Sequence, residues 1–196
     1  MARILVVYGT SEGHTAKVAG AVAETLRRTG AAADVYAADD PAPAPDDYYA
    51  VVVAASVHAG RYQRAVRMWV KAHGAVLARK PTAFVSVCLG VLQHDAKVER
   101  DLRAILDRFV AQTGWRPAAV KFVAGALPYT RYSWLQRVIM KRIVAKAGGD
   151  TDTRRDFEYT DWGDLRHFAE DFSHALPAAS LPVGVYPLEP TPNSPK

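Results

Sequence analysis

The sequence predicts an α/β protein in which a parallel sheet of five strands carries helices on both faces. Short apolar runs, typical of buried strands, alternate along the chain with longer segments of helical periodicity. Such alternation is typical of βαβ units, whose right-handed crossovers bring helices to both faces of a parallel sheet. The length of 196 residues and the hydrophobic content of 49% fit one domain with a full core.

The strands are expected where apolar residues run without interruption, and the helices are expected between them. In chain order the expected strands are Ile4–Tyr8, Ala33–Tyr36, Ala50–Ala55, Thr82–Cys88 and Val120–Ala124. Helical patterns separate them over about residues 15–29, 62–78 and 94–113. A last helix begins near Asp161, whose carboxylate suits an N-cap, and runs to about Leu176.

Residues 128–157 interrupt this rhythm and are expected as an insertion after, or within, the last strand. The segment starts with Pro128 and several aromatic residues and continues as a basic, apolar helix over residues 135–147. Residues 177–196 hold six of the twelve prolines of the chain, which is typical of a flexible or extended tail. We therefore expect a single domain over residues 1–176, followed by this tail.

The formal net charge of +5 is concentrated in the insertion. Residues 128–149 contain five basic and no acidic residues, so the rest of the chain is formally neutral. Such a local excess favours an anionic ligand, a membrane surface or nucleic acid as the partner. No nucleic-acid-binding motif accompanies it, so no nucleic acid is expected. The membrane-surface candidates lie beside an apolar helix face, and they are Arg137, Lys141, Arg142 and Lys146. The alternative is a helix packed on the sheet with its cations in solvent.

Composition indicates the compartment. The one cysteine, Cys88, excludes an internal disulfide framework, and its place at the end of an apolar run favours a buried structural thiol over a nucleophile. No run reaches the roughly 18 apolar residues of a transmembrane helix, and neither a signal-peptide pattern nor a zinc-ligand spacing is found. We expect a cytoplasmic protein without a metal site.

The loop after the first strand is a candidate phosphate site. It joins a buried strand to a helix N-terminus, where backbone N–H groups and the helix dipole favour an anion. The pattern of ATP- and GTP-hydrolysing loops is absent, and so is the Gly-x-Gly-x-x-Gly of dinucleotide sites. A hydroxyl-rich loop without lysine suits the single phosphate of a mononucleotide cofactor. The predicted binding residues are Thr10, Ser11, Glu12, Gly13, His14 and Thr15.

Two further loops are expected at the same edge of the sheet, because ligands of such sheets bind beyond the carboxyl ends of the strands. The loop after the third strand contributes Ser56, Val57, His58, Ala59, Gly60 and Tyr62. The fourth strand and its loop contribute Cys88, Leu89 and Gly90. Small residues let the backbone approach a planar ring, and Tyr62 or His58 could cover one face. The alternatives are a solvated His58 and a Tyr62 that begins the next helix. Together the loops describe a pocket for flavin mononucleotide (FMN).

The segment Tyr8–Thr15 resembles the phosphate loop of flavodoxins. Further segments are similar to the flavodoxin-type, quinone-dependent protoporphyrinogen oxidases of bacteria, namely Ala54–Tyr62, Trp115–Pro117, Ala124–Trp134, Gly148–Arg154 and Tyr159–Trp162. The match spans about residues 3–175, and residues 124–162 are its specific part because plain flavodoxins have no such block. The resemblance implies a flavodoxin-like sheet with strand order 2-1-3-4-5 and bound FMN. Flavodoxins often carry Thr where Glu12 stands, so this carboxylate must point away from the phosphate.

The resemblance also implies an activity. Members of the family oxidise protoporphyrinogen IX to protoporphyrin IX in haem biosynthesis, pass the electrons to a quinone such as menaquinone, and associate peripherally with the inner face of the cell membrane. The candidate substrate-binding residues are Arg61, Arg64, Tyr129, Arg131, Tyr132 and Trp134. No catalytic base and no oligomeric state can be named. The alternatives are a flavodoxin-type electron carrier and a flavin-dependent quinone reductase with another donor.

Overall fold

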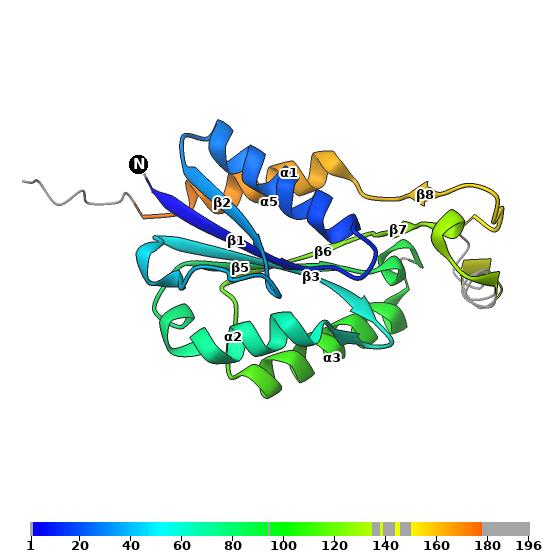
Figure 1. Ribbon diagram of the computed structural model, residues 1–196, viewed down its shortest axis with the longest axis horizontal. Helices are drawn as coiled ribbons and strands as arrows, with labels where there is room; N and C mark the ends of the chain where they lie inside the picture. Colours follow the sequence, from blue (N-terminus) through cyan, green and yellow to red (C-terminus); the bar gives the residue numbers. More distant parts are fainter. Residues whose placement is uncertain (1, 94, 135–137, 139–143, 146–149, 178–196) are drawn as a thin grey trace, which may run out of the picture.

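The sheet is built as the sequence predicts. The structure is a computed structural model that describes residues 2–93, 95–134, 138, 144–145 and 150–177. The main parallel strands are β1 (Arg3–Gly9), β2 (Ala32–Ala37), β3 (Ala50–His58), β5 (Thr82–Val87) and β6 (Ala119–Val123). They are arranged in the order β2-β1-β3-β5-β6, which is the predicted order 2-1-3-4-5 (Figure 1).

Four helices cover the two faces of the sheet, as predicted. Helices α1 (His14–Arg28) and α5 (Trp162–His174) cover one face, and α2 (Arg64–Leu77) and α3 (Ala96–Thr113) cover the other (Figure 1). Alternate β1 residues serve different cores: Ile4 and Val6 pack under α1 and α5, whereas Leu5 and Val7 pack under α2 and α3. Because both faces are buried, the strands read as continuous apolar runs.

The strand ends lie side by side at one edge of the sheet. Gly9 of β1 pairs with Ala55 of β3, Ser56 pairs with Val87 of β5, and Val87 pairs with Val123 of β6. All these strands are parallel, so the segments that follow them leave at the same edge. The register therefore brings the three predicted cofactor segments together.

The segment after β3 is a hairpin and not the predicted loop. Strand β3 continues to His58 and pairs antiparallel with the short β4 (Arg61–Tyr62). The two turn residues, Ala59 and Gly60, have φ angles of 47° and 71°. Positive φ at both positions is the signature of the two-residue turns that match strand twist. Glycine adopts this conformation readily, whereas Ala59 is held in a region that side chains with a Cβ disfavour.

The insertion follows the last strand of the main sheet. After β6 the chain forms β7 (Ala126–Leu127) and a 3₁₀ turn, η3 (Tyr129–Arg131), and it returns through β8 (Phe157–Glu158), which pairs antiparallel with β7. This part extends past the carboxyl ends of the strands, on the right of Figure 1. Two other 3₁₀ turns are η1 (Pro45–Asp47) and η2 (Leu89–Gln93).

Several predictions for the insertion and the tail fall outside the described residues. The four membrane-surface candidates and most of the predicted basic helix are among them, and so are residues 178–196. Within the described residues, no helix combines the length and apolar character needed to cross a membrane.

Candidate functional site

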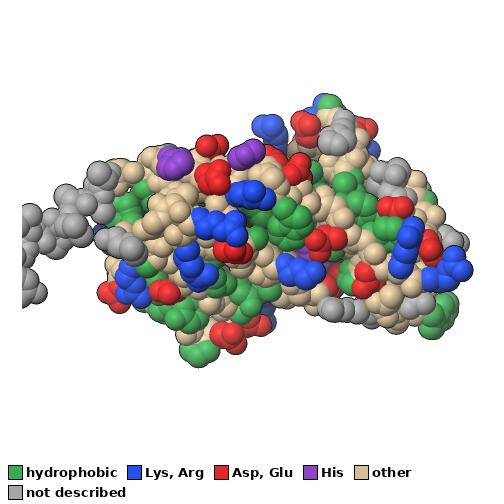
Figure 2. All heavy atoms as spheres, turned by 90° about the horizontal axis from the view of Figure 1, so that it is seen from above, with side chains coloured by type: hydrophobic (Ala, Val, Ile, Leu, Met, Phe, Trp, Pro, Cys, Tyr) green, Lys and Arg blue, Asp and Glu red, His purple; other side chains and the backbone are tan. Residues whose placement is uncertain are grey.

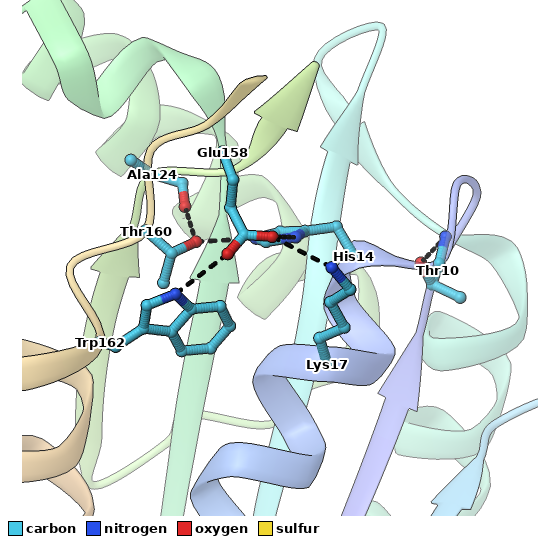
Figure 3. A network of polar contacts seen from close by, with 8 residues as sticks. Thr10, His14, Lys17, Ala124, Glu158, Thr160 and Trp162 are labelled. Atoms are coloured by element: carbon cyan, nitrogen blue, oxygen red, sulfur yellow. Dashed lines mark hydrogen bonds and ion pairs between the residues drawn. The ribbon is translucent and has the colours of Figure 1, made fainter. Parts of the chain in front are cut away.

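The predicted phosphate loop is preorganised at the start of α1. Gly13 is the N-cap and adopts a left-handed conformation with φ of 89°. Its N–H donates to Thr10 Oγ1 over 2.9 Å, which closes the loop on itself (Figure 3). Among the described residues no side chain caps α1, and its first turn holds no acidic residue. The N-terminal N–H groups and the positive end of the helix dipole are therefore directed at an anion site.

Gln63 joins the phosphate loop to the end of β3. Its Nε2 donates to Ser11 Oγ over 3.3 Å and to Ser56 Oγ over 2.5 Å. Its Oε1 accepts the Ser56 N–H over 3.2 Å. Sequence reasoning missed this residue, although its place directly before a helix is a signal for a polar side chain with a local role. One amide thus holds together two of the three predicted cofactor segments.

The hairpin places some predicted residues at the site and removes one. His58 and Ala59 are exposed, and Val57 and Gly60 are half-buried, so this turn can approach a ring. Tyr62 as a ring-stacking residue is wrong, because its side chain is 3% exposed. It packs edge-on against Phe84 and Phe109 in the core under α2 and α3, and its hydroxyl pairs with that of Ser86. Antiparallel pairing with β3 turns this side chain inward.

The segment after β5 supplies a half-buried turn. Cys88 is a free thiol, and burial raises its pKa, which supports the structural role predicted for it. Its Sγ accepts the Gly90 N–H over 3.4 Å. Beside Gly90 a cavity of about 260 Å³ lies between η2, α3 and β6, and its apolar lining includes Val98, Leu102 and Phe122. The turn that is predicted to bind the cofactor therefore borders this cavity.

His14 does not direct its ring at the phosphate loop, so its predicted part in binding is left to its backbone N–H group. Its Nε2 lies 2.7 Å from Thr160 Oγ1, and its Nδ1 lies 3.6 Å from a carboxylate oxygen of Glu158 (Figure 3). Since the Thr160 hydroxyl donates to the Ala124 carbonyl, it accepts from His14, which assigns the proton to Nε2. Burial lowers the pKa of His14 despite the nearby carboxylate. Only the His14 backbone is therefore available to the predicted phosphate site.

The Glu158 carboxylate is the common acceptor of this network. Lys17 Nζ and the Trp162 indole N–H donate to it over 3.2 and 3.0 Å (Figure 3). Burial acts to raise the pKa of Glu158, but these bonds and the Lys17 charge outweigh it, so the net direction is downward. Glu158, Thr160 and Trp162 lie far from the loop in sequence, and no local signal links them to it.

The Glu12 carboxylate turns toward the insertion, as its departure from the flavodoxin pattern requires. It accepts the Tyr132 hydroxyl over 2.9 Å. Tyr132 is 9% exposed and Tyr129 is fully buried, with its hydroxyl donating to the Asp150 carbonyl. Their assignment as substrate contacts is therefore wrong, because both rings form the core of the insertion.

The remaining candidates lie on the surface where it is described. Arg61 and Arg64 are exposed at β4 and at the start of α2. Trp134 is 76% exposed at the start of the insertion. Of Arg131 only the backbone is described. The described candidates that a large ligand can reach are thus two cations and one indole.

Thr15 is buried, so its contribution to an anion site is limited to the backbone.

Comparison with known proteins agrees with this geometry. The sequence model of the flavodoxin domain matches residues 5–154. Flavodoxin 1 from Bacillus cereus shares the fold at a TM-score of 0.55 and 15% identity, covering 89% of this chain and 99% of that one. The apo form of an NADH:FMN oxidoreductase gives a TM-score of 0.54 at 15% identity, with 92% of each chain covered.

Two curated relatives are more similar in sequence. A protein named protoporphyrinogen IX dehydrogenase [quinone] from Escherichia coli (strain K12) is 35% identical over 182 residues, covering 91% of this chain and 99% of the relative. A protein of the same name from Leishmania major is also 35% identical, covering 92% of this chain and 78% of the relative. These findings confirm the family resemblance read from the motifs. The chain therefore belongs to the flavodoxin domain family and is a relative of the proteins named protoporphyrinogen IX dehydrogenase [quinone].

Proposed function

We propose that this protein is an FMN-dependent protoporphyrinogen IX dehydrogenase that uses a quinone as electron acceptor. The observation that carries the proposal is the match to the Escherichia coli relative, which is 35% identical over 99% of the relative's length. The match therefore includes the insertion, which plain flavodoxins lack. The names of both relatives specify this substrate and this class of acceptor.

The site fits FMN. The phosphate would be held by the N–H groups of the Thr10–Gly13 loop and of the first turn of α1, with the exposed Ser11 hydroxyl beside them. The ring would lie between the turn at Ala59 and Gly60 and the half-buried turn at Leu89 and Gly90. When bound, FMN supplies a two-electron acceptor, and the protein supplies position and electrostatics.

The chain contributes charge and shape to substrate binding. Protoporphyrinogen carries two propionates on an apolar macrocycle. Arg61 and Arg64 are exposed next to the proposed ring site and can attract these carboxylates. Trp134, 76% exposed, offers a flat apolar surface at the start of the insertion. The α1 and α5 side of the molecule shows basic and acidic side chains mixed over its described surface (Figure 2).

We further propose peripheral membrane contact through the insertion, which would bring the site close to a lipid-soluble quinone. The support is the net basic sequence of residues 128–149 together with two exposed apolar side chains, Trp134 and Val138. Indole rings and cations are the groups that favour the membrane interface. Flotation with vesicles that contain about one-third anionic lipid tests this contact. The protein is expected to bind these vesicles and not zwitterionic ones. Failure to bind either kind of vesicle would refute the membrane contact.

The activity is tested by anaerobic mixing of the FMN-loaded protein with protoporphyrinogen IX. Loss of flavin absorbance together with rising porphyrin fluorescence is expected, followed by return of the flavin absorbance when a soluble menaquinone analogue is added. Flavin that is not reduced by the porphyrinogen would refute the proposed donor. Flavin that is reduced but not reoxidised by the quinone would refute the proposed acceptor.

A further inference from the structure

The FMN phosphate loop contacts the insertion from both ends. Near the start of the insertion, Tyr132 donates its hydroxyl to the Glu12 carboxylate over 2.9 Å. Just after its end, Thr160 accepts a hydrogen bond of 2.7 Å from His14. The two bonds join positions separated by 120 and 146 residues in the sequence. The side chains of two of the six loop residues, Glu12 and His14, are therefore bound at the two ends of the insertion and do not face the cofactor site.

The insertion also touches the third predicted cofactor segment, the turn after β5. Its described part has a core of its own, which we call the insertion core: Leu127, Tyr129, Tyr132 and Val144. Leu89, the first residue of η2, packs against this core together with Phe157 and Tyr159. The Tyr132 ring packs edge-on against that of Tyr129. This packing fixes the ring and therefore the direction in which its hydroxyl points. The same small core thus contacts two of the three segments that would hold FMN, the phosphate loop and the turn after β5.

We propose that Glu12 and Tyr132 are positioning residues that couple FMN binding to the insertion core. This inference rests on the FMN-binding part of the proposed function. Glu12 stands between Ser11 and Gly13, and its carboxylate would repel the dianionic phosphate if it faced the loop interior. The Tyr132 hydroxyl holds this carboxylate on the outer side, and the loop N–H groups then face the anion alone.

The coupling is reciprocal by thermodynamic necessity. If the packed insertion core favours the loop conformation that binds phosphate, then bound phosphate favours the packed insertion core by the same factor. Loss of one hydrogen bond to a charged group corresponds to about a tenfold change in an equilibrium constant. FMN would therefore both fill its own site and stabilise the surface that is proposed to receive the substrate.

The experiment compares two tyrosine variants of the full chain. Tyr132→Phe removes the hydroxyl that reaches Glu12. Tyr159→Phe is the matched control, because Tyr159 also packs on the insertion core but its hydroxyl contacts Asp150, over 3.0 and 3.1 Å. Two quantities are measured for each protein: the FMN dissociation constant from flavin fluorescence, and amide hydrogen exchange in peptides that cover residues 126–134 and 150–160, with and without FMN.

In the parent protein FMN is expected to slow exchange in these peptides. Tyr132→Phe should weaken FMN binding about tenfold and lose that slowing, while the loop peptide over residues 10–16 is still protected at saturating FMN. Tyr159→Phe should bind FMN within about twofold of the parent. Glu12→Gln keeps an acceptor but removes the charge that would repel the phosphate, so it should bind FMN within about twofold of the parent. Its bond to Tyr132 is weaker than that of the carboxylate, so the slowing of exchange by FMN should shrink, and this readout serves if Tyr132→Phe does not fold.

Unchanged FMN affinity in Tyr132→Phe, or slowing as in the parent in both Tyr132→Phe and Glu12→Gln, would overturn the coupling. Equal weakening by Tyr132→Phe and Tyr159→Phe would also overturn it, because loosening of the insertion core in general would then explain the effect. A parent protein that does not bind FMN would instead refute the proposed function. The two failures are therefore distinguishable.

Discussion

Replacing Gly9 by alanine should destabilise the protein and weaken cofactor binding together. Gly9 is the last residue of β1, directly before the phosphate loop. A Cβ at this position would lie 2.4 Å from Val66 Cγ2 and 3.3 Å from Gln63 Cβ. Val66 is fully buried in the core under α2, so it cannot move aside without disturbing its neighbours. Overpacking of this kind costs about 1–3 kcal/mol.

The measurement is urea unfolding of the FMN-free protein, followed by circular dichroism, with thermal melts in parallel. Each 1 kcal/mol of lost stability should lower Tm by about 2–4 °C in a protein of this size. FMN affinity should also fall, since displacement of α2 moves the Gln63 amide that binds Ser11 and Ser56.

Gly20→Ala is the matched control for this substitution. Gly20 lies inside α1, and a Cβ there would meet nothing within 4 Å. Alanine is the better helix former by about 0.5–1 kcal/mol, so this variant should be as stable as the parent or more stable. A Gly9→Ala protein as stable as Gly20→Ala, with parent-like FMN affinity, would refute the close approach of β1 and α2.

Three further predictions test the site assignments. Tyr62→Phe should lower the free energy of unfolding by about 1 kcal/mol through loss of the buried bond to Ser86, and the spectrum of bound FMN should not change; a spectral shift would return Tyr62 to the ring. Burial lowers the pKa of His14 below its ordinary value of 6.5, so the folded state binds fewer protons than the unfolded chain as pH falls below about 6.5, and stability is lost there. His14→Gln should remove this part of the loss when unfolding is measured at about pH 7.5 and 5.5, and identical pH dependences would contradict the assignment. Arg61→Ser combined with Arg64→Ser should raise KM for protoporphyrinogen IX by about 3–10-fold at low salt and leave the FMN dissociation constant unchanged, whereas an unchanged KM would exclude these cations from substrate binding.

Local patterns in the sequence determined the elements and their order. The five main strands are uninterrupted apolar runs because they are buried on both faces, and this burial is visible in the residues themselves. The strand–loop–helix unit around Gly13 is equally local, because the N–H groups of a helix start need no distant partner to form an anion site. The family resemblance rests on the same contiguous motifs.

Side-chain directions, in contrast, were decided by contacts between distant segments. Tyr62 was predicted at the cofactor, but the two-residue turn at Ala59 and Gly60 sets a hairpin register that directs it into the core. The rings of Tyr129 and Tyr132 were predicted to bind the substrate, yet they form a small core because β7 and β8 close the insertion across about thirty residues.

The polar partners of the phosphate loop show the same division. The sequence predicts that residues 10–15 gather at an anion, and it does not predict that His14 turns to Thr160 or that Glu12 turns to Tyr132. Hydrogen bonds between side chains depend on which groups the folded chain brings within about 3 Å, and no local sequence pattern indicates these distant pairs. The sequence by itself determined where a phosphate can bind, and the tertiary structure decided which of the loop side chains hold the insertion.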